Sequence, residues 1–220
     1  PLNIALLDSA LRSAQQAGIP IVFLASSISS YGGVLISGEN YEMGLEAGHA
    51  GGELINELFD GQGRVLILDY PDMDIIVDRV NGLREGVLEV APGSEIVASR
   101  LGGTRPLGYA SVKAALAEGL GFNTILSLND AGSLGAIQAL EEAGIDPASV
   151  VISSVDAEGA ARDLIRRGHF LRASVSVDRE GFSNAAIYAA LRLLAGEPLP
   201  ETLIVLPGPV ITAANVDEVE

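Results

Sequence analysis

The chain has 220 residues, and 48% of them are hydrophobic, which is enough apolar surface for one large domain or for two small lobes. Twenty-nine acidic residues against thirteen basic ones give a formal net charge of -16, which repels nucleic acid phosphates, so we expect no direct nucleic acid contact by this segment. The lack of cysteine excludes thiolate chemistry, and His49 and His169 lie far apart, so we expect no metal site and no cofactor.

Apolar residues at helical spacing predict a first helix over 6–17, which Gly18 and the following Pro20 bring to an end. Short apolar runs predict strands over 21–25 and 33–37, followed by a helix over 41–59. From there the two kinds of element alternate. We expect strands over 64–69, 95–100, 124–128, 150–155 and 171–177, and helices over 74–90, 107–120, 131–143, 157–167 and 179–194.

The alternation breaks after Gly196, where four prolines surround a strand predicted over 202–206, followed by Val210, Ile211 and a short acidic end. This pattern indicates either a last crossing of the chain between two lobes or an irregular tail.

The predicted strands are apolar without alternation, as over 65–68 and 150–152, so both of their faces are expected to be buried. A parallel sheet covered by helices on both sides has this pattern. The fold class is therefore α/β and doubly wound, with right-handed crossovers. No stretch approaches the roughly 20 apolar residues of a membrane span.

Ligands of open parallel sheets bind at the carboxyl ends of the strands, and the residues at these positions are unusually polar. They are Ser26, Ser27, Glu39, Asn40, Asp69, Tyr70, Asn129, Asp130 and Asp156. Asp130 and Asp156 are also placed to cap the helices that follow them. Asn129 and Asp156 fit a ligand role better, because they end adjacent parallel strands and point into one crevice.

Arg79 lies on the helix predicted over 74–90, and its role has two interpretations. It is either a surface arginine, paired with Asp74 or Asp78, or a five-donor group that binds hydroxyls or a carboxylate at the crevice.

Enzyme signatures are missing from the sequence. No G-x-G-x-x-G follows a strand, no P-loop is present, and the segment 131–135 resembles a nucleophile elbow only superficially.

Six segments resemble, in order and spacing, the type I periplasmic binding proteins for ribose, galactose and related sugars, with the effector domains of LacI-type regulators as cousins. They are 14–22 (A-x-x-A-G-I-P), 36–44 (S-G-E-N-x-x-x-G), 78–83 (R-x-x-G), 128–136 (N-D-x-x-x-x-G-A), 154–157 (V-D) and 210–218 (I-T-x-x-N-V-D-E). The resemblance implies two lobes of doubly wound parallel sheet, the first formed by 1–38 and 178–207 and the second by 39–177 and 208–220.

The resemblance also implies roles for single residues. Arg79, Asn129 and Asp156 match positions that hydrogen-bond sugar hydroxyls, with Tyr70 and Ser26 as further candidates at strand ends. Hinge segments are implied at Gly38 and Glu39, at Val177 and Asp178, and over 206–209. We expect the structure to place these residues in such roles.

Two departures from the family are visible. Ala25 and Ser26 stand where sugar binders commonly carry Asp followed by Arg, and Val177 is apolar where some members place a polar contact. The family also has about sixty further residues ahead of Pro1, so the first lobe is expected to be incomplete, and this chain alone is expected to bind poorly or to associate through open sheet edges.

Two functions fit these features, and a third would need a nucleophile, a cofactor loop or an acid/base pair that the sequence does not show. The first is a receptor that binds a sugar-like solute in the cleft between two lobes and serves an ABC permease or a sensor. It would be periplasmic or extracellular, and membrane-associated through an anchor that is not in this segment. The second is the effector domain of a cytoplasmic LacI-type regulator, and the third is a Rossmann-like enzyme. The segment 60–64 resembles transport proteins more than regulators, which favours the receptor.

Overall fold

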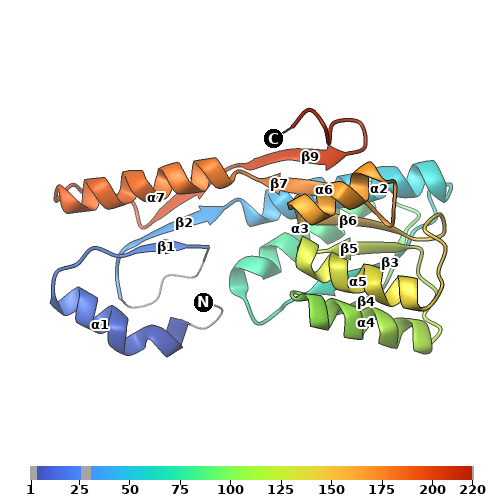
Figure 1. The fold of residues 1–220 in the computed structure, drawn as a ribbon, viewed down its shortest axis with the longest axis horizontal. Coiled ribbons are helices and arrows are strands. Elements are labelled where there is room, and N and C mark those ends of the chain that lie inside the picture. Colours follow the sequence, from blue (N-terminus) through green and yellow to red (C-terminus); the bar gives the residue numbers. More distant parts are fainter. Residues whose placement is uncertain (1–3, 26–30, 220) are drawn as a thin grey trace. The chain divides into compact units, whose positions relative to one another are not determined.

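The computed structural model describes residues 4–25 and 31–219 (Figure 1). The chain divides into two compact units, Pro1–Glu39 with Asp178–Pro207 and Asn40–Val177 with Gly208–Glu220. The chain therefore passes from one unit to the other three times. The first passage falls after Glu39, one residue later than the boundary expected from the sequence.

The first unit contains a three-stranded parallel sheet in the order β1-β2-β8. Its strands are β1 (Val22–Leu24), β2 (Val34–Gly38) and β8 (Thr202–Val205), and its helices are α1 (Asp8–Gln16) and α7 (Arg179–Leu194). Successive residues of β2 point to opposite faces, so Ile36 packs with Ala189 of α7 while Leu35 joins a cluster that includes Leu11 of α1. One helix thus covers each face of this sheet (Figure 1).

The first helix is shorter than expected. A 3₁₀ turn, η1 (Ile4–Leu7), precedes it, and α1 begins at Asp8. Leu6 is 82% exposed and no residue of α1 is fully buried, so packing does not extend the regular helix back to Leu6.

Helix α7 presents an apolar face outward. Ile187, Leu191 and Leu194 recur at helical spacing and are 60%, 63% and 72% exposed. No residue in the described part of the chain covers this face.

The second unit contains a six-stranded sheet in the order β4-β3-β5-β6-β7-β9. The strands are β3 (Arg64–Asp69), β4 (Glu95–Leu101), β5 (Thr124–Ser127), β6 (Val151–Asp156), β7 (Leu171–Val177) and β9 (Pro207–Thr212). The helices are α2 (Asn40–Leu58), α3 (Asp74–Val90), α4 (Arg105–Ala117), α5 (Asp130–Glu142) and α6 (Gly159–Arg166).

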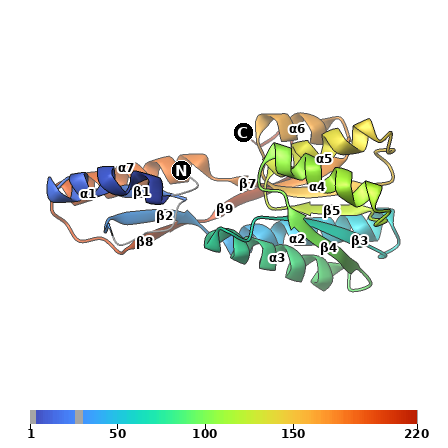
Figure 2. The same cartoon turned by 90° about the horizontal axis from the view of Figure 1, so that it is seen from below.

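Alternate residues of the central strands enter two different cores. Val65 and Ile67 pack with α2 and α3 on one face, whereas Leu66 and Leu68 pack with α4, α5 and α6 on the other (Figure 2). Neighbouring strands from β4 to β7 pair in parallel. The predicted doubly wound α/β class is confirmed.

Strand β9 was not expected at its observed length, because the sequence places Pro207 and Pro209 inside it. In the sheet it stands at the edge, beside β7. A proline lacks the N–H that a central strand needs, but an edge strand tolerates the loss.

Helices α2 and α3 approach each other closely through glycines. A Cβ atom on Gly44 would overlap the carbonyl oxygen of Arg79, and one on Gly82 would overlap that of Tyr41. The absence of side chains at these two positions lets the backbones touch, and this contact places the first turns of α3 beside the start of α2.

Candidate functional site

The residues predicted for the site in the second unit gather at one edge of its sheet. Tyr70 follows β3, Asn129 follows β5 and Asp156 ends β6, and these three strands are neighbours in the order β3-β5-β6. Arg79 belongs to the second turn of α3, the helix that follows β3. The parallel direction of the strands brings their carboxyl ends to the same edge, as the sequence predicted.

The Arg79 guanidinium is held by backbone and side-chain acceptors. One terminal nitrogen donates to the carbonyl oxygen of Leu128 at 2.8 Å, and the other donates to Oδ1 of Asn40 at 2.7 Å. Its buried Nε finds no hydrogen-bond partner among the described residues. Burial lowers the pKa of Arg79, and the Asp156 carboxylate opposes that shift. The interpretation of Arg79 as a surface residue paired with Asp78 is wrong, while the side chain of Asp74, the other partner considered, lies outside the described residues.

Asn129 is the N-cap of α5. Its Oδ1 accepts from the N–H of Gly132 at 2.9 Å, and its Nδ2 donates to the carbonyl oxygen of Gly103 at 3.0 Å. An amide side chain carries two donors and two acceptor lone pairs. One N–H and one lone pair of Asn129 are thus unused by the described residues, while the rest of the group is fixed in orientation.

Asp156 is the last residue of β6 and lies in a turn with positive φ values, +113° at Asp156 and +47° at Ala157. Its carboxylate acts electrostatically on both Arg79 and Asp130. The N-cap of the following helix is Glu158, so the interpretation of Asp156 as a helix cap is wrong.

Tyr70 directly follows β3, at the same edge of the sheet. The ring packs against Gly103, where a Cβ atom would come within 2.7 Å of it, and it flanks the core formed with α2 and α3. Gly103 also accepts the hydrogen bond from Asn129, so one residue joins the Tyr70 and Asn129 positions.

Asp130 has a role that the sequence did not indicate. It is the first residue of α5 rather than its cap, and it is fully buried. Its oxygens accept from Ser174 Oγ and from the N–H of Glu158, each at 2.8 Å. Burial raises the pKa of Asp130 to about 7, opposed by these hydrogen bonds and assisted by Asp156. The only indication of this contact in the sequence was Ser174, a polar residue in the middle of the otherwise largely apolar strand β7.

The remaining predicted residues lie elsewhere. Ser26 falls outside the described residues. Gly38 ends β2, and the N–H of Glu39 donates to the carbonyl oxygen of Val205 at 3.3 Å. Val177 ends β7, and Asp178 is the N-cap of α7, accepting from Gly181 at 2.8 Å.

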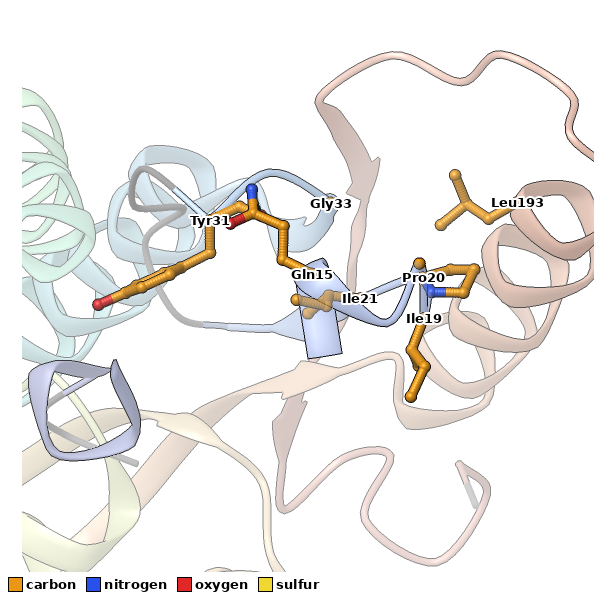
Figure 3. Close-up of a pocket in the computed structure, with 8 residues that line it drawn as sticks. Gln15, Ile19, Pro20, Ile21, Tyr31, Gly33 and Leu193 are labelled. Atoms are coloured by element: carbon orange, nitrogen blue, oxygen red, sulfur yellow. Dashed lines mark hydrogen bonds between the residues drawn. The ribbon is translucent and has the colours of Figure 1, made fainter. Parts of the chain in front are cut away.

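A pocket of about 270 Å³ lies within the first unit (Figure 3). It is lined by Gln15, Gly18, Ile19, Pro20, Ile21, Tyr31, Gly33 and Leu193. Its polar side chains are already engaged, because Gln15 donates to the carbonyl oxygen of Tyr31 at 3.1 Å and the Tyr31 hydroxyl donates to Asp8 at 2.7 Å. The rest of the lining is mainly apolar, so this pocket has few groups to offer a polar solute.

A second pocket, of about 440 Å³, lies between residues 50–58 of α2 and Arg172. Asn40, which contacts Arg79, stands at the opposite end of α2, and the helical rise separates it from Ala50 by about 15 Å. This pocket is therefore remote from Arg79, Asn129 and Asp156.

The site combines one guanidinium, one carboxylate and one amide, which suits the binding of hydroxyl groups. No group of three or more His, Asp or Glu residues that could hold a metal ion occurs among the described residues, and none of the helices described is long and apolar enough to cross a membrane.

The model of the periplasmic binding protein domain matches residues 1–198. The chain belongs to this family. The family resemblance inferred from the six sequence segments is therefore confirmed.

Three relatives illustrate the relationship. The putative rhizopine-binding protein of Rhizobium meliloti is 39% identical over 103 residues, which are 47% of this chain and 33% of that protein. The ABC transporter periplasmic-binding protein YphF of Escherichia coli (strain K12) is 21% identical over 202 residues, 90% of this chain and 62% of that protein. The chain thus spans less than two thirds of the length of both curated relatives.

The third relative of this periplasmic binding protein is known from its structure. It is a Mycobacterium smegmatis protein solved in complex with β-D-fucofuranose, 25% identical, with a TM-score of 0.79 over 96% of this chain and 70% of that one.

Proposed function

We propose that this protein binds a small polar solute, a sugar or a sugar-like molecule, and delivers it to an ABC-type permease or a sensor. It acts in the periplasm or outside the cell and catalyses no reaction. The observation that carries the proposal is the convergence of Arg79, Asn129 and Asp156 at adjacent strand ends, joined by the hydrogen bond from Arg79 to Leu128.

The chemistry of these three side chains supports a neutral polyhydroxyl ligand. The Arg79 guanidinium donates from the N–H groups that Leu128 and Asn40 leave free, a carboxylate accepts from two hydroxyls, and an amide donates one hydrogen bond and accepts another. The opposite charges of Arg79 and Asp156 offset each other, so the site does not demand a charged ligand. Tyr70 supplies an aromatic edge next to Asn129, and Ser26 remains a candidate contact.

The relatives support the same class of function. Their names describe a rhizopine-binding protein and a component of an ABC transporter, and the solved neighbour holds a furanose sugar. None of these descriptions is of a transcription regulator, so the LacI-type alternative is not favoured. In this proposal the segments at Gly38 and Glu39, at Val177 and Asp178, and over 206–209 act as hinges.

Thermal unfolding with a panel of solutes tests the proposal. The panel contains L-arabinose, D-fucose, D-allose, myo-inositol, allitol and a nucleoside. A solute at about 100 times its Kd stabilises the native state by about 2.7 kcal/mol, which raises the midpoint by roughly 5 to 10 °C.

The matched variants are Asp156→Ala, which removes the proposed contact, and Asp163→Ala, which removes an exposed carboxylate paired with Arg166. We expect the first variant to lose the shift and the second to keep it. An unchanged shift in Asp156→Ala would show that the site is assigned wrongly, and a panel without any shift would count against the sugar class.

A further inference from the structure

The turn that carries Asp156 is strained. Asp156 and Ala157 both have positive φ values although neither is glycine, and side chains with a Cβ atom rarely adopt such conformations. A conformation of this kind persists only where surrounding contacts hold it. The contacts that hold the turn therefore decide where the Asp156 carboxylate lies.

Two buried side chains hold the backbone N–H groups of the turn. Ser174 Oγ accepts from the N–H of Ala157 at 2.9 Å, and Asp130 Oδ2 accepts from the N–H of Glu158 at 2.8 Å. Ser174 in turn donates to Asp130 Oδ1 at 2.8 Å, so the two side chains form one connected network. In addition, Arg162 Nε donates to the carbonyl oxygen of Ala157 at 2.9 Å.

The network joins three elements of the second unit. Asp130 begins α5, Ser174 lies in β7, and the turn connects β6 to α6. Asp130 and Ser174 are both 0% exposed, so neither can touch a bound solute, whereas Asp156 at the strand end is only partly buried. Asp130 also adjoins Asn129, which caps the same helix.

We propose that Asp130, acting together with Ser174, is a positioning residue that sets the direction of the Asp156 carboxylate in the solute site. This inference rests on the proposed function and names a further residue on which that function depends.

A carboxyl group suits this task because each of its two oxygens accepts a hydrogen bond, one from Ser174 and one from Glu158. An asparagine in its place would keep one acceptor oxygen and turn an NH₂ group toward either Ser174 or Glu158. The burial that raises the pKa of Asp130 also shows that a titratable group is kept here at a cost in desolvation, which an apolar residue would avoid.

The test compares Asp130→Asn and Ser174→Ala with Ser153→Ala. Ser153 is an equally buried serine, in β6, whose hydroxyl donates at 2.7 Å to the carbonyl oxygen of Ala47 and not to the turn. All three variants lose a buried hydrogen bond, so general destabilisation affects the control as well. An effect seen in Asp130→Asn and Ser174→Ala but not in Ser153→Ala is therefore due to the lost support of the turn and not to lower stability.

Two measurements are made on each protein. The first is made without solute. It follows amide exchange at Ala157 and Glu158, together with the NMR signals of the Arg79 guanidinium, on which the Asp156 carboxylate acts electrostatically. The second is calorimetric titration with D-fucose and myo-inositol.

We expect exchange at the turn to accelerate at least tenfold and the Arg79 signal to move in Asp130→Asn and Ser174→Ala, but not in Ser153→Ala. Binding of either solute that the parent binds should weaken tenfold or more in the first two variants only. Unchanged exchange and an unmoved Arg79 signal would overturn the inference. If the parent binds neither solute, the thermal-unfolding panel still decides the proposed function, and the solute-free measurement decides separately whether Asp130 positions Asp156.

Discussion

The guanidinium of Arg79 donates a 2.8 Å hydrogen bond to the carbonyl oxygen of Leu128, the residue immediately before the N-cap Asn129. Through this bond the second turn of α3 is tied to the carboxyl end of β5. The positions of Arg79 and Asn129 are therefore coupled, and a change at Arg79 should affect both stability and solute binding.

Replacement of Arg79 by lysine tests this coupling. The ammonium group of lysine is compact, and it cannot reproduce the planar geometry with which Arg79 reaches both Leu128 and Asn40. We expect Arg79→Lys to lower the free energy of unfolding by about 1 to 3 kcal/mol, because a buried acceptor loses its partner. Urea unfolding measures this change. The control, Arg84→Lys on the same helix, should change stability by less than about 0.5 kcal/mol.

The backbone of Asp156 provides a second prediction. At a positive φ, glycine is free of the steric strain that a Cβ atom causes. We expect Asp156→Gly to be more stable than Asp156→Ala by about 1 kcal/mol, the reverse of the usual order within a strand, and neither variant to bind a solute. At Ser99, an exposed residue of β4, the alanine variant should instead be the more stable one. If the alanine variant were the more stable one at both positions, the turn at Asp156 would not be strained.

The contact between α2 and α3 provides a third prediction. A Cβ atom on Gly44 would overlap the carbonyl oxygen of Arg79, whereas one on Gly159 meets no atom within 4 Å. Gly44→Ala should force the helices apart and cost about 1 to 3 kcal/mol of stability. Because this displacement moves α3, solute binding should weaken as well. Gly159→Ala should preserve both properties in parallel unfolding and titration experiments, and equal effects at the two positions would argue against the close helix contact.

The buried carboxyl of Asp130 makes stability depend on pH. Its folded-state pKa is raised to about 7 by burial, above the ordinary value of 3.8, so the folded protein holds this proton more tightly than the unfolded chain. Stability from this group is fully present below about pH 4 and is lost as the pH rises toward 7, with a total on the order of 4 kcal/mol.

Asp130→Asn removes the titrating group, so the decline between pH 4 and pH 7 should become shallower in urea unfolding curves. Asp163→Asn, at an exposed carboxylate, serves as the control and should follow the parent. Identical pH profiles for the parent and Asp130→Asn would mean that Asp130 titrates near its ordinary value.

The sequence alone was sufficient for the fold class and for the placement of the candidate site residues at one edge of the sheet. Runs such as Val65 to Leu68 are apolar on both faces, and only a sheet covered by helices on both sides buries them, which the two cores of the second unit confirm. Because parallel strands end at one edge, the polar residues Tyr70, Asn129 and Asp156 could be assigned to that edge before any coordinates were known.

The tertiary structure decided which partner each polar side chain takes. Asn129 and Asp130 are adjacent in sequence and both are good helix caps, yet the first caps α5 and the second is buried against Ser174, which is 44 residues away. Likewise, Arg79 bonds to Leu128, which is 49 residues away, rather than to Asp78. Local propensity describes what a residue can do within one turn of the chain, whereas hydrogen bonds between distant strands form only when the sheet brings them together. For that reason, the positive φ of Asp156 and the network that holds it became visible only in the folded structure.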